Sequence, residues 1–427
     1  MKIKVIKKPY SEIISELEAN PRKHVKPVKP NIFFRTLMKL VSIPDLISTR
    51  FHCEKIGMEK LGKNEPAFFL MNHSSFIDLE IAASVLYPRP FNIVATTDGF
   101  IGKEWLMRQI GCIPTRKFVA DPTLIRDMHY AIKKKRSSVV MFPEAGYSFD
   151  GRATTLPDTL GRCVKMMGVP LVMIRTFGAF TRDPLYNNLQ RRKVDVSARV
   201  EYLLSKEEIA AMPDEQITAL IREQFSFDSF RWQEENQISV KEPFRADGLN
   251  RILYKCPACL KEGEMEGKGI HIKCNSCGKS HTLTEYGTLT SEGEAAFKHV
   301  TDWCDWEREC VREEIESGRY TLDIPVDLLV IVDTKTLYSV GEGRLRQTKD
   351  GFHLVSDDGQ INYEQKVLTS YTLNSDFNWY ELGDIISIGD NKVLFYCIPK
   401  TKGDVAAKAR LAQEEAYKLA SLARSRA

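Results

Sequence analysis

The chain of 427 residues contains no run of about 18 uncharged apolar residues, the length that a helix needs to cross a bilayer. We therefore expect no transmembrane helix. The basic N-terminal residues 1–7 are not followed by an apolar core, so they do not have the pattern of a secretory signal peptide. These two absences predict a cytoplasmic protein that would meet a membrane only at its surface.

Strong net charge and a disulfide framework are also missing. The formal net charge is only +4, and there is no dense cluster of arginine and aromatic residues, so the sequence does not favour nucleic acid as a partner. Six of the ten cysteines are scattered, without the regular spacing of a disulfide-stapled secreted domain. We expect these six to be reduced thiols, which agrees with a cytoplasmic location.

The sequence also lacks the Gly-x-Ser-x-Gly motif, which argues against the nucleophile turn of the α/β hydrolases. It does contain His73 and Asp78, five positions apart, directly after the apolar run 67–71. An apolar run that ends in small polar residues is typical of a buried strand that stops at an exposed site. Imidazole can take a proton at neutral pH, and a carboxylate can hold its tautomer. We therefore predict that His73 activates a hydroxyl group of the substrate.

A histidine and an aspartate at this spacing are more often structural than catalytic, so three later segments matter. They are residues 110–117 (Ile-Gly-Cys-Ile-Pro-Thr-Arg-Lys), 139–148 (Val-Val-Met-Phe-Pro-Glu-Ala-Gly-Tyr-Ser) and 168–172 (Gly-Val-Pro-Leu-Val). Together with residues 71–78, they resemble the four ordered blocks of the glycerolipid acyltransferase family (1-acylglycerol-3-phosphate acyltransferase-like). Those blocks are Asn-His-x4-Asp, a Gly-x-Ile block that ends in Arg, Phe-Pro-Glu-Gly, and Val-Pro. The resemblance extends over about residues 50–235.

The resemblance implies a reaction and a set of roles. His73 would act as general base and Asp78 would orient it, so that an acceptor hydroxyl attacks the carbonyl of an acyl thioester. The donor would be acyl-CoA or an acyl carrier protein thioester, and the acceptor would be a glycerophosphate or a lysophospholipid. Arginine suits phosphate because of its planar fork of donors, and the glutamate would position the glycerol part. The implied substrate-binding residues are Asn72, Arg116, Lys117 and Glu144.

Two positions depart from the family pattern. The family's arginine usually stands six residues after the glycine of its block, whereas here that position holds Lys117 and Arg116 stands one residue earlier. In the third block, Tyr147 occupies the place of a phosphate-binding arginine. We expect either a different lysolipid as acceptor or a phosphate held differently, for which Arg152 is one candidate. Two alternative functions stay open: a non-catalytic lipid- or partner-binding protein, and a thioesterase.

The remaining four cysteines form two Cys-x2-Cys pairs, Cys256 with Cys259 and Cys274 with Cys277, which are separated by fourteen residues. This spacing is typical of a four-thiolate zinc site. Four soft thiolates close a tetrahedron and leave no open position, so we predict a structural Zn²⁺ in a zinc ribbon. His271 and His281 are near in sequence but are not needed as ligands.

Residues 31–43 are expected to form a helix between Pro30 and Pro44. Its wide apolar face, with Arg35 and Lys39, suits a helix at a bilayer surface, although the same pattern fits a helix packed on a protein core. Residues 1–30 contain eight lysines and arginines against three glutamates, which suits an anionic membrane surface or a solvated arm. We predict peripheral attachment to a membrane.

Strand-like and helix-like runs alternate in the first half, which predicts an α/β acyltransferase domain with a mostly parallel sheet. Its strands are expected at 67–71, 91–95, 139–142, 170–174 and 193–202. Short strands expected at 328–332, 351–355, 363–368, 379–382 and 393–398 predict a C-terminal antiparallel β module. The predicted divisions are a basic arm with an amphipathic helix (1–50), the acyltransferase domain (51–236), the zinc ribbon (250–287), a helical connector (288–319), the β module (320–400) and a C-terminal helix (401–427). Residues 236–250 are expected to be a short polar linker, and the C-terminal helix is expected to be charged and rich in alanine.

Overall fold

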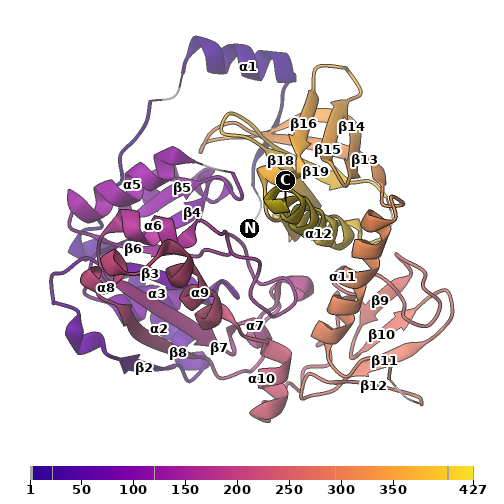
Figure 1. Cartoon of the computed structure of the whole chain (residues 1–427), viewed down its shortest axis with the longest axis horizontal. Coiled ribbons are helices and arrows are strands. Elements are labelled where there is room, and N and C mark those ends of the chain that lie inside the picture. Colours follow the sequence, from indigo (N-terminus) through magenta and orange to yellow (C-terminus); the bar gives the residue numbers. More distant parts are fainter. Residues whose placement is uncertain (1–2, 22, 120, 294, 402, 427) are drawn as a thin grey trace.

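The computed structural model describes residues 3–21, 23–119, 121–293, 295–401 and 403–426 of the chain. An α/β region lies on one side of the molecule and two antiparallel sheets lie on the other, with the C-terminal helix between them (Figure 1). Two residues of the predicted basic arm, Lys2 and Arg22, lie outside the described residues.

The α/β region contains a seven-stranded sheet in the order β2-β8-β7-β3-β6-β4-β5. Neighbouring strands are parallel except for β7 and β8, so the predicted mostly parallel sheet is confirmed. The edge strands β2 and β5 were not expected, because both are short and neither contains a long apolar run. The strands are β2 (His52–Ile56), β3 (Phe68–Met71), β4 (Phe91–Thr96), β5 (Cys112–Thr115), β6 (Ser138–Met141), β7 (Leu171–Phe177) and β8 (Ser197–Leu204).

Helices cover both faces of this sheet (Figure 1). Alternate side chains of β3 enter two different cores: Phe69 and Met71 pack with helix α3, whereas Phe68 and Leu70 pack with α5, α6 and α9. A strand that is covered on both faces needs apolar residues throughout, which explains the run 67–71. The carboxyl end of β3 is therefore held from both sides. The helices are α3 (Ile77–Leu86), α4 (Glu104–Gln109), α5 (Pro122–Lys133), α6 (Leu160–Met167), α7 (Ala179–Arg182), α8 (Lys206–Ala211), α9 (Asp214–Phe225) and α10 (Ser229–Glu235).

Helix α2 (Ile32–Ser48) continues past Pro44, where the sequence predicted its end. Proline removes one backbone hydrogen bond, but tertiary contacts hold the last turn of this helix. Leu46 is buried, and the Asp45 carboxylate pairs with Arg182 and Arg191 of the α/β region. The prediction of a stop at this proline was wrong because these long-range ion pairs are not visible in the local sequence.

The paired cysteines lie at one small antiparallel sheet, with Cys274 at the end of a strand and the other three in adjacent turns and loops. The strand order of this sheet is β12-β11-β10-β9, and helix α11 (Val300–Glu316) follows it. Residues 236–250 were expected to be a polar linker, but Arg245, Ala246 and Leu249 are buried. The backbone N–H of Ala246 donates to Gly269 O at 2.9 Å, so this segment packs on the ribbon. The strands are β9 (Met265–Lys268), β10 (His271–Cys274), β11 (Ser280–Leu283) and β12 (Leu289–Ser291).

The second antiparallel sheet forms the β module, in the order β16-β15-β14-β13-β19-β18-β17, and the N-terminal strand β1 (Val5–Lys7) pairs in parallel with β14. Helix α1 (Tyr10–Ala19) follows β1. Four of the five predicted strands overlap observed ones, whereas residues 379–382 mainly form the turn between β17 and β18. Strand β14 was not expected, because glycines and charged residues obscure the alternation of its buried side chains. The strands are β13 (Leu322–Ile331), β14 (Leu337–Thr348), β15 (Gly351–Ser356), β16 (Asn362–Lys366), β17 (Asn374–Trp379), β18 (Gly383–Gly389) and β19 (Leu394–Pro399).

Helix α12 (Val405–Arg426) lies between the α/β region and the β module and packs against α11 (Figure 1). The sequence predicted a charged, alanine-rich helix here. The structure buries several of its charged side chains, including Arg410, Glu414 and Glu415. The small residues Ala406 and Ala409 are also buried, and they allow the helix to approach its neighbours closely. This helix therefore joins the two halves of the molecule.

Candidate active site

His73 follows the carboxyl end of β3, and Asp78 lies in the first turn of α3. His73 Nδ1 is 3.1 Å from Asp78 Oδ2, which also accepts hydrogen bonds from the backbone N–H groups of Ser74 at 2.6 Å and Ser75 at 3.0 Å. Asp78 is fully buried, while 22% of the His73 side chain is exposed. Because Nδ1 faces the carboxylate, Nε2 is the ring nitrogen that remains available to a substrate.

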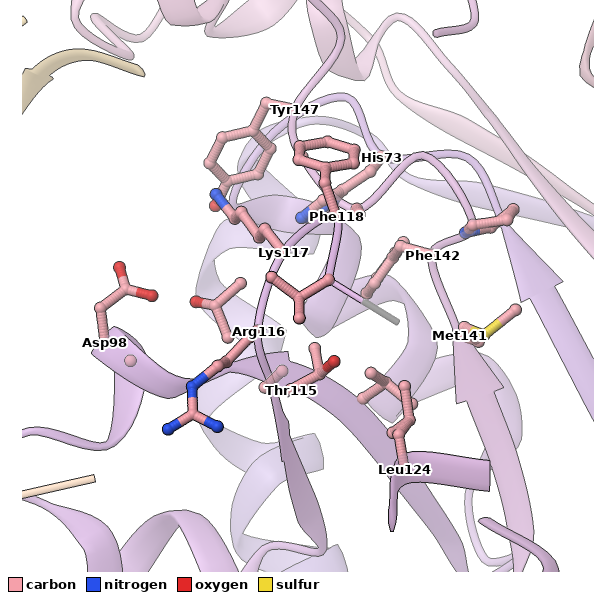
Figure 2. A pocket seen from close by; sticks show the side chains of 18 of the residues that line it. His73, Asp98, Thr115, Arg116, Lys117, Phe118, Leu124, Met141, Phe142 and Tyr147 are labelled. Atoms are coloured by element: carbon pink, nitrogen blue, oxygen red, sulfur yellow. The ribbon is translucent and has the colours of Figure 1, made fainter. Parts of the chain in front are cut away.

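The imidazole of His73 lies between two aromatic rings (Figure 2). The Phe142 ring stacks on it with centroids 4.0 Å apart, and the Tyr147 ring lies 4.3 Å away at an interplanar angle of 45°. Both rings come from the segment that follows β6, so the third sequence block supplies them. Packing on two faces restricts the ring to one orientation, and that orientation keeps Nδ1 on Asp78.

Glu144 does not face the cavity where a glycerol group would bind. Its Oε1 accepts a hydrogen bond from the backbone N–H of His73 at 3.0 Å, and its Oε2 accepts one from Thr154 N at 2.9 Å. The side chain is buried, and burial raises the pKa of this carboxyl to about 7. Glu144 therefore connects the loop of His73 to the loop of Thr154.

Asn72 is also a connecting residue. Its Oδ1 accepts a hydrogen bond from Thr176 N at 2.8 Å, and its amide nitrogen donates to Thr176 Oγ1 at 3.0 Å, which ties the end of β3 to β7. Thr176 Oγ1 in turn lies 3.4 Å from Asp78 Oδ1. No sequence motif pointed to Thr176, because it stands about a hundred residues away along the chain. Asn72 thus helps to hold the carboxylate that orients His73.

Arg116 and Lys117 lie just after β5 and point in different directions (Figure 2). Arg116 donates hydrogen bonds to the carbonyl oxygens of Asn391 and, at 3.2 Å, Val332, both in the β module. Burial lowers the pKa of its guanidinium. The Lys117 side chain extends toward Tyr147, on the His73 side of the cavity (Figure 2). Of these two cations, Lys117 is therefore the one directed at the candidate reaction centre.

Arg152 was considered as a substitute for the missing phosphate-binding arginine. Its guanidinium is instead paired with Asp150 at 2.6 Å and with Asp305 of α11 at 2.7 Å. Burial opposes its charge, but these carboxylates raise its pKa well above the usual range. Arg152 thus holds α11 against the α/β region, and the structure does not bring it into the cavity.

His73 borders a cavity of about 1700 Å³. Parts of its wall come from the matched sequence blocks, and further parts come from β17, the turn after it and α12. Sequence reasoning missed these C-terminal residues, because they lie about 300 to 340 positions from His73 and belong to no recognised motif. The missed wall residues include Tyr371, Asp376, Phe377, Trp379, Tyr380 and Tyr417.

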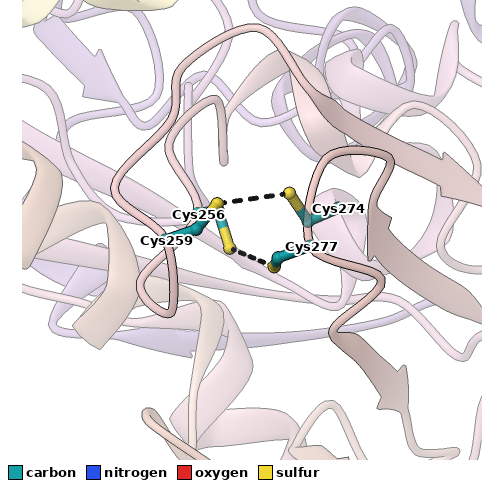
Figure 3. A group of neighbouring side chains, drawn as sticks. All are labelled: Cys256, Cys259, Cys274 and Cys277. Atoms are coloured by element: carbon teal, nitrogen blue, oxygen red, sulfur yellow. Dashed lines mark hydrogen bonds between the residues drawn. The ribbon is translucent and has the colours of Figure 1, made fainter.

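The four predicted metal ligands are brought together (Figure 3). Their sulfur atoms all lie within 4.8 Å of one another, with Cys256 Sγ and Cys277 Sγ 3.7 Å apart and Cys259 Sγ and Cys274 Sγ also 3.7 Å apart. A tetrahedral Zn²⁺ with bonds of about 2.3 Å needs sulfur atoms about 3.8 Å apart, so this donor set fits zinc. His281 lies outside this cluster and packs against Trp303.

Within the part of the chain that the structure describes, no helix has the length and apolar content needed to span a bilayer. Helix α2 nevertheless exposes a row of large apolar residues. Phe33 is 65% exposed and Leu37 39%, and Trp105 of α4, which is 68% exposed, lies near α2 through an edge contact with Phe34 at 6.0 Å. This apolar surface, formed by α2 and α4, does not belong to the core. Its other exposed members are Ile32, Leu40, Val41, Ile43, Ile47 and Leu106.

The part of the chain that contains these residues is similar to known proteins. Residues 52–176 match the family model described as Acyltransferase. Over 130 residues the chain is 30% identical to the chloroplastic 1-acyl-sn-glycerol-3-phosphate acyltransferase LPAT1 of Arabidopsis thaliana, a match that covers 29% of this chain and 35% of that protein. The chain therefore spans about a third of the length of this curated relative.

A solved structure is also similar, namely the 1-acyl-sn-glycerophosphate (LPA) acyltransferase PlsC from Thermotoga maritima. The match covers 45% of this chain and 78% of that chain, with 15% sequence identity and a TM-score of 0.31. This score is too low to support an argument about the fold.

Proposed function

From the premise that residues 52–176 form an acyltransferase domain of the glycerolipid type, we propose that this protein transfers a fatty acyl group from a thioester to a hydroxyl group of a glycerophosphate or lysophospholipid. The donor would be acyl-CoA or an acyl carrier protein thioester. The observation that carries the proposal is the His73–Asp78 pair, which stands at the cavity wall inside the matched segment.

In the proposed reaction, Nε2 of His73 takes the proton of the acceptor hydroxyl while its oxygen bonds to the thioester carbonyl carbon. The tetrahedral intermediate then collapses, the carbon–sulfur bond breaks, and His73 returns the proton to the departing thiolate. Asp78 keeps the proton of the neutral ring on Nδ1 and stabilises the imidazolium. The two aromatic rings and the backbone contacts of Glu144 keep the imidazole in place.

The membrane role that we propose for α2 rests on its apolar face. Arg35, expected to add charge for the lipid surface, donates to Pro88 O, and Lys39 lies over the Tyr87 ring at 4.4 Å, so both basic groups are partly engaged within the protein. The apolar side chains would then contribute most of the attachment. Helix α4 extends from this surface to the cavity, since Trp105 belongs to one and Met107 to the other. A lipid acceptor would therefore have only a short distance to travel from the membrane to the cavity beside His73.

Replacing His73 by alanine tests the reaction. We expect acyl transfer to fall by about 10²–10⁴-fold, because a general base is lost. Asp78→Asn should lose much of the activity through the wrong tautomer, and His129→Ala, on an exposed face of α5, is the matched control. Wild-type turnover in a folded His73→Ala variant would contradict the proposal. Thioester hydrolysis that a lysolipid does not suppress would indicate a thioesterase, and lipid binding without turnover a binding protein.

Vesicle binding tests the attachment. Phe33→Glu combined with Leu37→Glu should release the protein from anionic vesicles, while activity on a short-chain soluble acceptor should persist. Leu260→Glu with Leu368→Glu is the matched control, because these leucines are 61% and 39% exposed and lie outside the apolar surface. If the first double variant still sediments with vesicles, α2 is not the anchor.

A further inference from the structure

The cavity beside His73 has two chemically different parts. One part is aliphatic and comes from the α/β region, with Ile93, Val94, Leu124, Met128 and Met141 in its wall. Leu124 and Met141 lie well away from Tyr147, with Phe142 between them (Figure 2). The other part is aromatic and polar, and the β module supplies much of it. An acyl chain fits the aliphatic part, which leaves the polar part for the head group of the acceptor.

The wall from the β module is held firmly against the α/β region. Trp379 Nε1 donates a hydrogen bond to Asp98 Oδ2 at 3.2 Å, and the Trp379 ring stacks on Tyr396 with centroids 4.6 Å apart. The contacts of Arg116 with Val332 and Asn391 also hold the β module against the α/β region. The residues of this turn are therefore a fixed part of the cavity and can determine which acceptor fits.

Lys117 and Asp376 both line the cavity, and Asp98 lies on the same wall. Asp376, just before the turn, is half-buried and lines the cavity. Burial raises the pKa of Asp376 to about 6, and the positive charge of Lys117 acts to lower it. Asp376 Oδ1 accepts a hydrogen bond from Phe377 N at 2.8 Å, which fixes the direction of its carboxylate.

We infer, as an extension of the proposed acyl transfer, that Lys117 and Asp376 bind the head group of a zwitterionic lysophospholipid, with its phosphodiester at Lys117 and its ammonium at Asp376. A phosphate monoester carries up to two negative charges, and at Lys117 it would share the cavity with the carboxylates of Asp376 and Asp98. Tyr147 stands where the related proteins have a second cation. A phosphodiester with an attached ammonium has the charges that match this pair.

The aromatic residues support the same assignment. Tyr371, Phe377 and Tyr380 line this part of the cavity together with Tyr147. Aromatic faces attract ammonium groups through their ring quadrupole, and this attraction is strongest where water is excluded. A carboxylate among aromatic rings is therefore a suitable environment for an ammonium group, and an unsuitable one for a second negative charge.

The test compares two acceptors with the same acyl chain, lysophosphatidylethanolamine and lysophosphatidic acid, using the whole protein and one acyl thioester. We expect the wild-type protein to favour the zwitterionic acceptor in kcat/KM by about 10-fold or more. Asp376→Asn, which keeps the hydrogen bond from Phe377, should remove most of this preference by raising KM for the zwitterion. The KM for the thioester should not change. Asp357→Asn, on an exposed hairpin of the same module, is the matched control.

The outcomes separate this inference from the proposed function. If neither acceptor is acylated, the acyl-transfer proposal fails and this inference fails with it. If the wild-type protein acylates both acceptors equally or favours lysophosphatidic acid, acyl transfer stands and the inference is overturned. The inference is also overturned, and acyl transfer still stands, if Asp376→Asn leaves the kcat/KM ratio of the two acceptors unchanged. The wild-type ratio decides the question even if the variant does not fold.

Discussion

Glu144 of the α/β region and Glu414 of helix α12 are both buried glutamates, but their surroundings shift the pKa in opposite directions. Burial raises the pKa of Glu144 to about 7, and backbone N–H groups are its hydrogen-bond donors. Burial also acts against the charge of Glu414, but Arg308 at 2.7 Å and Arg410 at 3.2 Å outweigh it and lower the pKa to about 2. Burial alone therefore does not decide the charge of a carboxyl group.

The difference follows from what each glutamate holds together. Glu144 joins two loops of one region, and hydrogen bonds to backbone N–H groups suffice for that. Glu414 stands where α12 meets α11 and the β module, and Arg410 extends this cluster to Thr154 of the α/β region at 3.1 Å. A buried ion cluster has strict geometry, because breaking it leaves uncompensated charges. The junction of α12 with its neighbours thus depends on paired charges, whereas the loops around Glu144 depend on hydrogen bonds to the backbone.

Among the changes that would separate the stabilities of the two halves, loss of the metal should have the largest effect. Structural zinc sites contribute roughly 10–16 kcal/mol of apparent binding free energy, so Cys256→Ser with Cys274→Ser should unfold residues near 250–285. The α/β sheet should persist. Elemental analysis should find zinc in the wild-type protein and in a Cys310→Ser control, and hydrogen exchange should locate the unfolding. Absence of zinc from freshly purified, reduced wild-type protein would refute the site.

Arg308→Met is the next largest change. It leaves Glu414 with only one of its two arginines, and breaking a buried pair typically costs about 3–5 kcal/mol of unfolding free energy. Chemical denaturation measures this loss. Adding Glu414→Gln should recover part of it, because the uncompensated charge is removed. A loss below about 1 kcal/mol would show that the cluster behaves like a surface ion pair.

The pH dependence of stability should differ in sign between the two glutamates. The pKa of Glu144 is higher in the fold, so its contribution is fully present below pH 4.5 and is lost as pH rises toward 7. The pKa of Glu414 is lower in the fold, so its contribution is present above pH 4.5 and is lost as pH falls toward 2. Each of these contributions to the free energy of unfolding is on the order of 3 kcal/mol. Denaturation of the wild-type protein, Glu144→Gln and Glu414→Gln from pH 3 to 8 measures both, and difference curves with the same slope would contradict the contrast.

Thr154→Val should have the smallest effect. It removes the hydroxyl that accepts a hydrogen bond from Arg410 but keeps the backbone N–H that binds Glu144, so we expect a loss of about 1 kcal/mol. The effect should be the same at pH 5 and pH 8, because the hydroxyl does not titrate. A strong pH dependence would mean that the two buried glutamates are coupled through this residue.

Local sequence predicted the structure correctly where the contacts that form it join residues close together along the chain. His73 and Asp78 share one strand-loop-helix segment, and Asp121, which stands directly before a proline, caps α5 by accepting a hydrogen bond from Thr123 N at 2.8 Å. The same reasoning was wrong about Pro44 and about residues 236–250. There, contacts with distant residues hold conformations that the local pattern disfavours.

The sequence by itself determined the apolar run of β3, the pairing of His73 with Asp78, and the spacing of the four cysteines, because each depends on a few positions along one segment. Only the tertiary structure decided that Glu144 and Asn72 brace the loops, that Arg116 holds the β module while Lys117 turns toward His73, and that Asp376 lines the same cavity. The physical reason is distance along the chain. Folding brings these groups together from separate elements, and no local pattern records which partner a charged side chain will meet.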